Sequence, residues 1–370
     1  MIKNLAIIFS ATLMLLVFTP NQVDAQLKMP AASPEAEISQ RVGITDITIH
    51  YSRPFAKGRT IWGDLVPYGF NDFGFGTSKS APWRAGADYN TTIEFTHDVS
   101  IQGSKVPAGK YGLFMALEET DDVMIILSSN TTSWGSYFYD EAEDVLRFNV
   151  KAQANSEMVE MLTFNFKTVD ETSATASLTW GEKEIPFTID VDVTEVVMTD
   201  IEKNLRNPIG FEQSTWDEAA TFAFDAGQHD KALEWVNGSI SGNFFSKETF
   251  SNLSLKAQIL EEKGMTSDAT EILNKALPLG TSNDIYRLGS RFLQKKNIGK
   301  AMEVMTANVE NNDGAFPSNY GLARVYSAKG EYKVALEHLE KSMALAPANF
   351  KPRLEKYMTQ LRNGEDINPK

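Results

Sequence analysis

The sequence of 370 residues contains no cysteine. Disulfide bonds, acylation of an N-terminal cysteine and thiolate zinc sites are therefore excluded. Histidine is also scarce, and none of the four residues lies four positions from another or within an H-E-x-x-H pattern. The four are His50, His97, His229 and His338. We expect no bound metal and no cofactor.

The chain also lacks a basic excess, because its formal net charge is −14. Residues 26–193 hold 13 Lys and Arg against 24 Asp and Glu, a net charge of −11, and residues 194–370 hold 21 against 24, a net charge of −3. No basic stripe is present that would neutralise phosphates. This balance argues against nucleic acid and anionic membrane as partners.

Only one long apolar run occurs, from Leu5 to Phe18, with Lys3 before it and Val23-Asp24-Ala25 after it. A positive start, a short apolar run and a small residue at the cleavage position are typical of a secretory signal. We predict a signal peptide over residues 1–25, with cleavage near Ala25 and a periplasmic or secreted product. No later segment is apolar enough to span a membrane.

Signatures of catalysis are missing as well. There is no G-x-S-x-G elbow, and the acidic runs 118–122 and 140–144 lack the D-x-D-x-D-G spacing of a calcium loop. A pair of carboxylates that hydrolyses glycosides stays an alternative, because the distance between two carboxylates depends on the fold rather than on the sequence. We assign no catalytic residue, and the sequence favours a noncatalytic protein.

From Ile44 to Val193 the dominant hydrophobic period is two, as expected for strands with one buried face. The run 123–127 is apolar on both faces, which indicates an interior strand. Short strands without intervening helices predict an antiparallel β-sandwich over residues 26–193. The predicted strands are 44–51, 91–96, 111–117, 123–127, 145–150, 162–167, 174–180 and 185–193.

Four motifs in this half resemble, in order and spacing, a bacterial domain of unknown function, family 2911, over residues 27–193. The resemblance implies an exported β-sandwich and no established reaction. This chain departs from the family pattern by inserting residues 70–81 between the first and second of these motifs, and the insertion either roofs a pocket or lengthens a turn. The motifs are SPEAEISQRVGITDITIHYSRPFAKGRTIWGDLVPYG, PWRAGADYNTTIEF, PAGKYGLFMAL and WGSYFYDEAEDVLRFNVK.

Aromatic residues of the first half concentrate at loops and strand ends, between Tyr51 and Tyr139. Flat rings with polar neighbours hold planar or sugar-like ligands, and arginines such as Arg59 add forked hydrogen bonds. The alternative is that the rings cap the open ends of the sandwich. The candidate ligand-binding residues are Arg53, Trp83, Arg84, Trp134 and Tyr137.

Beyond Thr199 the period becomes that of helices. Four segments place an alanine five residues after a turn position, and successive alanines lie 37, 32 and 34 residues apart. The turn positions are Gly227, Gly264, Lys296 and Gly330, and the alanines are Ala232, Ala269, Ala301 and Ala335. This spacing predicts about four helical hairpins over residues 200–362. Thr199-Asp200 predicts a helix that begins at Ile201.

The last unit resembles the tetratricopeptide family in its order of large, small, aromatic and turn residues, and that resemblance implies a groove for a protein or peptide. The residues predicted to pack the repeats are Gly264, Ala269, Gly289, Phe292, Ala301, Tyr326, Gly330, Ala335 and Pro347.

The sequence therefore predicts an exported noncatalytic protein. Its tetratricopeptide-like scaffold would bind an envelope protein or peptide, and its β-sandwich would have a structural role or an unknown ligand. The alternative is a carbohydrate- or peptide-binding module with an aromatic and arginine cleft, with or without hydrolytic activity. The residues specify neither the partner nor the oligomeric state.

Overall fold

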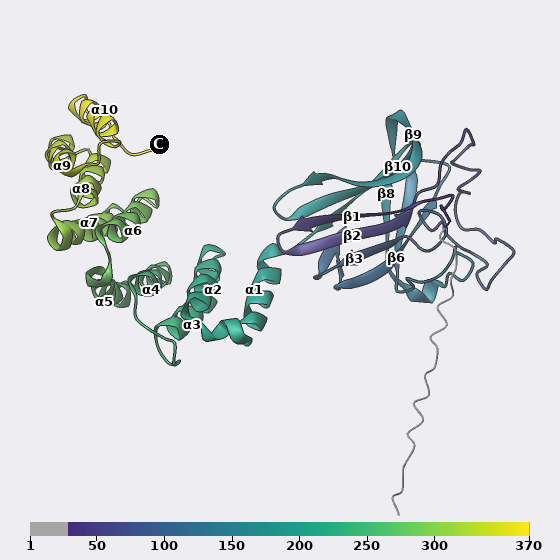
Figure 1. Ribbon diagram of the computed structural model, residues 1–370, viewed down its shortest axis with the longest axis horizontal. Coiled ribbons are helices and arrows are strands. Elements are labelled where there is room, and N and C mark those ends of the chain that lie inside the picture. The colour runs from purple at the N-terminus through teal and green to yellow at the C-terminus, as the bar shows by residue number, and fades with distance from the viewer. Residues whose placement is uncertain (1–28, 370) are drawn as a thin grey trace, which may run out of the picture. The chain divides into compact units, whose positions relative to one another are not determined.

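The computed structural model describes residues 29–369, and the signal peptide predicted for residues 1–25 lies outside them. Residues 29–42 and 46–190 form one compact unit, and residues 43–45 and 191–369 form a second. We call these the β unit and the helical unit (Figure 1).

The β unit consists of two sheets. The six-stranded sheet has the order β1-β2-β3-β6-β7-β8, and the four-stranded sheet has the order β5-β4-β10-β9. The run 123–127 falls in β7, between β6 and β8, as its two apolar faces predicted. The strands are β1 (Glu35–Val42), β2 (Thr45–Ser52), β3 (Thr92–Phe95), β4 (Val99–Ile101), β5 (Ser104–Val106), β6 (Gly109–Leu117), β7 (Asp122–Ser128), β8 (Asp144–Lys151), β9 (Gln153–Val169) and β10 (Ser173–Asp190).

Ring contacts join the two sheets face to face. Tyr51 of β2 meets Phe164 of β9 edge-on at 4.9 Å, and the Phe164 backbone N–H donates to the Tyr51 hydroxyl at 3.1 Å. The ring centroids of Phe148 in β8 and Phe187 in β10 lie 6.0 Å apart. The antiparallel pairing and this shared core confirm the predicted sandwich.

Two features of the β unit differ from the prediction. The sequence predicts separate strands at 174–180 and 185–193, but residues 174–180 and 185–190 both belong to β10, whose pairing with β9 shifts register around Gly181. Gly181 has a φ of 61°, and such a bulge bends a strand without ending it. Strands β1, β4 and β5 and the first part of β9 are absent from the predicted strands, because β1 and the start of β9 are mostly polar and β4 and β5 have only three residues each.

The helical unit contains ten α-helices within the described part of the chain. After α1, helices α2 to α9 pair as four successive hairpins, which confirms the predicted tetratricopeptide-like repeat (Figure 1). No helix formed by residues 29–369 is both long and apolar enough to cross a membrane. The helices are α1 (Val193–Asn204), α2 (Gln213–Asp225), α3 (His229–Ile240), α4 (Phe250–Glu262), α5 (Thr266–Ala276), α6 (Ser282–Gln294), α7 (Ile298–Asn312), α8 (Phe316–Ala328), α9 (Tyr332–Leu345) and α10 (Lys351–Arg362).

All four hairpin turns place one residue in the left-handed region, where glycine is favoured. Gly227, Gly264 and Gly330 have φ values of 74°, 76° and 79°. Lys296 occupies the same place between α6 and α7 with a φ of 58°. The turn residue therefore has left-handed backbone in all four hairpins, although the hairpin of α6 and α7 has lysine there instead of glycine.

The first helix begins earlier than predicted. Helix α1 starts at Val193 rather than Ile201, and the Asp192 carboxylate caps it by accepting from the Glu195 backbone N–H at 3.0 Å. The sequence predicts a strand residue at Val193, because it continues the apolar alternation of β10. The Asp192 cap and the burial of Val196 outweigh that local preference.

The residues after α10 return to helix α8. The Ser327 hydroxyl donates to the Asp366 carboxylate at 2.6 Å, and the Arg324 Nε donates to the Asn368 side chain at 3.0 Å. Ile367 between them is only 5% exposed. We call residues 366–368 the tail clasp.

Candidate functional site

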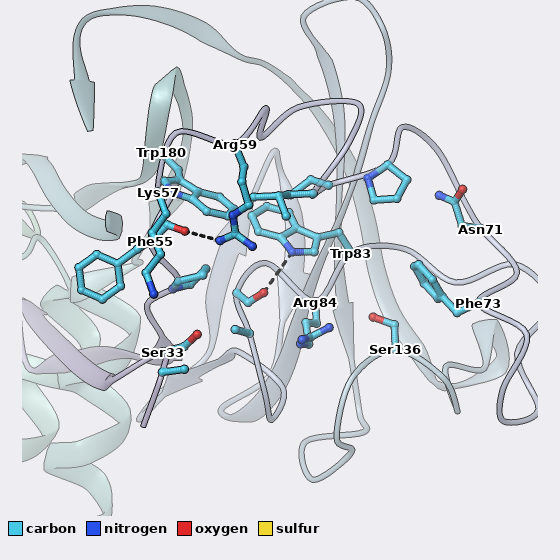
Figure 2. Close-up of a pocket in the computed structure, with 17 residues that line it drawn as sticks. Ser33, Phe55, Lys57, Arg59, Asn71, Phe73, Trp83, Arg84, Ser136 and Trp180 are labelled. Carbon is cyan, nitrogen blue, oxygen red and sulfur yellow. Dashed lines mark hydrogen bonds between the residues drawn. The ribbon is translucent and has the colours of Figure 1, made fainter. Parts of the chain in front are cut away.

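The β unit contains a cavity of about 590 Å³ near the loops that precede β3. Figure 2 shows Lys57, Phe55 and Arg59 toward one end, Asn71 and Phe73 toward the other, and Trp83 between them. We call it the β-unit cavity. It is lined by Ala32, Ser33, Pro54, Phe55, Lys57, Arg59, Leu65, Val66, Pro67, Asn71, Phe73, Trp83, Arg84, Gly86, Ala87, Ser136 and Trp180.

Three tryptophans support one wall of this cavity. Trp83 and Trp180 stack with ring centroids 6.3 Å apart, and Trp62 meets each of them edge-on at 5.9 and 6.0 Å. The Trp83 indole N–H donates to the Gly86 carbonyl at 3.2 Å, and that of Trp180 donates to the Glu160 carbonyl at 3.3 Å. Stacking and hydrogen bonding therefore hold the rings in place before any ligand arrives.

Arg84 brings a largely desolvated charge to the cavity. Its guanidinium forms no hydrogen bond or ion pair with residues 29–369, and its Nε is buried without a partner. Burial lowers the pKa of Arg84, while the charges of Tyr137 and Asp88 act in the opposite direction. A guanidinium has five N–H donors, and those of Arg84 are left unused here.

Arg59 is oriented by backbone carbonyls. Its Nε donates to Ala56 at 3.0 Å and one Nη donates to Phe55 at 2.7 Å, as Figure 2 shows for one of these bonds. Lys57 lies beside it with its Nζ 5.8 Å from the centre of the Phe55 ring. Neither cation forms an ion pair within the described chain.

The insertion at residues 70–81 is a hairpin closed by two hydrogen bonds between Asn71 and Ala81, both 2.9 Å. Phe73 and Phe75 meet the Tyr137 ring edge-on at 5.9 and 5.3 Å, and a Cβ on Gly76 would lie 2.2 Å from the Tyr137 carbonyl oxygen. Asn71 and Phe73 also line the cavity. The insertion therefore closes one end of the hollow and is more than a longer turn.

The structure separates the five residues proposed as a ligand site. Trp83 and Arg84 line the cavity, and Tyr137 supports it through Phe73. Trp134 stacks on Tyr137 at 5.9 Å but is itself 52% exposed and lies outside the lining. Arg53 points elsewhere, because its guanidinium donates to the Leu162 carbonyl at 2.9 Å and the Thr163 hydroxyl at 2.6 Å.

Lys57, Phe55 and Trp180 line the cavity and were not named as site residues from the sequence. Lys57 has a φ of 51°, in the left-handed region. Phe55, two residues before it, and Arg59, two residues after it, both line the cavity. The Lys57-Gly58 pair was the available turn signal. Trp180 belongs to a predicted strand of ordinary alternation, so nothing in the sequence marks it as a site residue.

A second cavity, of about 410 Å³, lies among α6, α8 and the start of α10. Tyr320 stacks on Tyr286 of α6 at 5.5 Å and on Phe316 at 5.6 Å, and Phe316 contacts Phe350 at 5.3 Å. We call it the ring cavity. It is lined by Asn283, Tyr286, Phe316, Pro317, Tyr320, Pro347, Phe350 and Arg353.

The residues predicted to pack the repeats occupy several kinds of position. Gly264 and Gly330 form turns, and Gly289 faces Met305. Tyr326 stacks on His338 with ring centroids 5.4 Å apart, and Pro347 borders the ring cavity. The others are buried: Ala269, Phe292, Ala301 and Ala335.

The acidic runs serve as ion-pair partners at strand ends. Asp122 pairs with Lys151 at 2.6 Å, Asp121 with Lys183 at 2.8 Å, and Asp144 with Arg147 at 2.6 Å. Over residues 29–369 no three His, Asp or Glu side chains converge as metal ligands would.

Comparison with known sequence families matches each unit separately. Residues 33–189 match the family described as "Protein of unknown function (DUF2911)". The resemblance noted from the sequence is thereby confirmed, and the β-unit cavity is a feature of this DUF2911 region. Residues 316–349, which span α8 and α9, match the tetratricopeptide repeat. A search of curated proteins finds no match.

Solved structures similar to this chain are tetratricopeptide repeat proteins. The C-terminal part of one from Cytophaga hutchinsonii is 17% identical, with 46% of this chain and 67% of that chain covered and a TM-score of 0.33. One from Parabacteroides merdae is also 17% identical, with the same coverages and a TM-score of 0.31. YrrB, described as having an unusual peptide-binding site, is 16% identical, with 44% and 84% covered and a TM-score of 0.28.

Proposed function

We propose that the protein is an exported, noncatalytic interaction protein whose helical unit binds a peptide segment of an envelope protein. The ring cavity is the observation that carries the proposal. Tyrosine, phenylalanine and arginine are enriched where proteins meet, because large rings bury much area at a small entropic cost. Tyr286, Phe316 and Tyr320 are already stacked, so a partner would not have to order them.

The lining also suggests the chemistry of the partner segment. Arg353 is its one charged residue, exposed and 5.8 Å from the centre of the Phe350 ring. Proline and aromatic side chains form the rest of the lining, apart from Asn283. A partner segment with an apolar side chain next to a carboxylate would fit both the aromatic lining and the charge of Arg353. Export is proposed on the residues near the start of the chain, which have the pattern of a secretory signal.

The test is capture of a partner from an envelope extract by the full chain and three variants. Phe350→Ala removes a ring of the cavity, and Arg353→Glu reverses its charge. Phe244→Ala is the matched control, because it removes an 86% exposed ring that is not part of the cavity lining. Circular dichroism checks that each variant is folded.

We expect wild type and Phe244→Ala to recover the same protein, and both cavity variants to recover at least about tenfold less. Equal recovery by the cavity variants would place binding elsewhere. Recovery of nothing by wild type at low and moderate salt would contradict the interaction role itself.

A further inference from the structure

The charges that line the β-unit cavity have one sign. Lys57, Arg59 and Arg84 all reach it, and no aspartate or glutamate lines it within the described chain. Residues 26–193 as a whole carry a net charge of −11. A cationic hollow in an acidic domain attracts anions, because low-dielectric walls concentrate the field of the charges that line them.

Both arginines have N–H donors that form no hydrogen bond with the described residues. Arg84 makes no hydrogen bond with residues 29–369, and Arg59 uses only its Nε and one Nη on carbonyls. Asp88 influences Arg84 electrostatically without forming an ion pair with it. A desolvated guanidinium gains more from a bound oxyanion than an exposed one, since it has already lost its water.

The remaining walls are mostly apolar and aromatic. Trp83 and Trp180 form a stacked pair at one wall, and Phe55 and Phe73 add rings at separate places. A volume of about 590 Å³ is within the range of sites that enclose one small organic molecule. Inorganic phosphate alone would leave these rings uncovered.

We propose that the β-unit cavity binds a small organic oxyanion, a carboxylate or phosphate monoester carried on an aromatic or apolar body. Arg84 and Arg59 bind the oxyanion, and Trp83 and Phe73 contact the body. This inference goes beyond the proposed interaction role, which concerns the helical unit. Its failure would leave that role untouched.

The experiment is titration calorimetry of the full chain with four probes. Phenylacetate and phenyl phosphate combine a ring with the two kinds of oxyanion, benzyl alcohol keeps the ring without charge, and inorganic phosphate keeps the charge without the ring. The variants are Arg84→Gln and Arg59→Gln. Lys110→Gln is the matched control, because Lys110 is an exposed cation of β6 outside the cavity.

We expect at least one ring-bearing anion to bind, and to bind at least about tenfold more weakly to each arginine variant, while Lys110→Gln is unchanged. Whichever of the two anions binds identifies the source of the oxyanion. Arg59 is exposed, so Arg59→Gln keeps the test valid if Arg84→Gln does not fold. Equal binding of benzyl alcohol, equal binding by folded arginine variants, or binding of neither ring-bearing anion would overturn the proposal.

Discussion

Glu184 shows how a single carboxylate can be kept charged inside the β unit. The residue is 8% exposed, and its carboxylate accepts from Lys167 Nζ at 2.5 Å and from the Ser177 hydroxyl at 2.7 Å. Burial by itself would raise the pKa of Glu184, but the bonds from Lys167 and Ser177 outweigh it and hold the pKa below the ordinary value.

A depressed native pKa means that Glu184 stabilises the fold above the unfolded pKa of about 4.3, and that this contribution is lost as pH falls through the native value. We expect Glu184→Gln to lower the free energy of unfolding at pH 7 by about 1–3 kcal/mol. The difference from wild type should shrink below about pH 4. Urea unfolding of the full chain across this range measures it.

Glu182→Gln is the control for that measurement, because Glu182 is an exposed neighbour on the same strand. It should change the free energy of unfolding by no more than about 0.5 kcal/mol at any pH. A cost of Glu184→Gln that did not depend on pH would show that its charge plays no part.

Residue types and local patterns located part of the candidate site. The Trp83-Arg84 pair stands out because it lies at a loop-to-strand junction, and both residues do line the cavity. Arg53 lies at an equally suggestive place, just after β2, yet its guanidinium donates to β9 rather than into the cavity. Which carbonyl an arginine meets depends on the pairing of distant strands, and spacing along the chain does not contain that information.

At the level of elements, the four hairpin turns form a natural comparison. Gly330 has a φ of 79°, and a Cβ added there would meet nothing within 4 Å. Gly330→Ala therefore tests backbone strain without steric clash. We expect it to lower the free energy of unfolding of the helical unit by about 1 kcal/mol, as left-handed backbone costs a residue with a Cβ.

Gly314 provides the matched control. It too has open space around its Cβ position, but its φ is not in the left-handed region. Gly314→Ala should be neutral or slightly stabilising, because alanine restricts the unfolded chain. Equal effects of the two substitutions in chemical denaturation would show that the turn conformation is not what selects glycine.

Elements with strong periodicity could be predicted from the sequence, and polar or merged elements could not. The repeat hairpins are specified by small residues at helix contacts and by turn residues, all of them local signals. The polar strand β1 and the polar first half of β9 show no alternation that a single sequence reveals. Their partners in the sheets define them, and those contacts are distant in sequence.

At the level of the whole molecule, export is a prediction that a direct measurement can check. The proposal places the mature N-terminus at Gln26, immediately after Ala25. Mass spectrometry of the protein from periplasmic and extracellular fractions should find a chain that begins there or within a few residues. Recovery of the uncleaved chain from the cytoplasm alone would contradict the proposed location and would not affect either cavity.

The tail clasp has a mechanical consequence. Because residues 366–368 are bonded to Ser327 and Arg324 of α8, helix α10 lies inside a closed loop of the chain. Tension applied through residues 366–369 is transmitted first to α8, and several hydrogen bonds and the buried Ile367 must yield before α10 can be peeled away. A pulling force at residues 366–369 therefore acts on the repeat at the interior helix α8 rather than at α10.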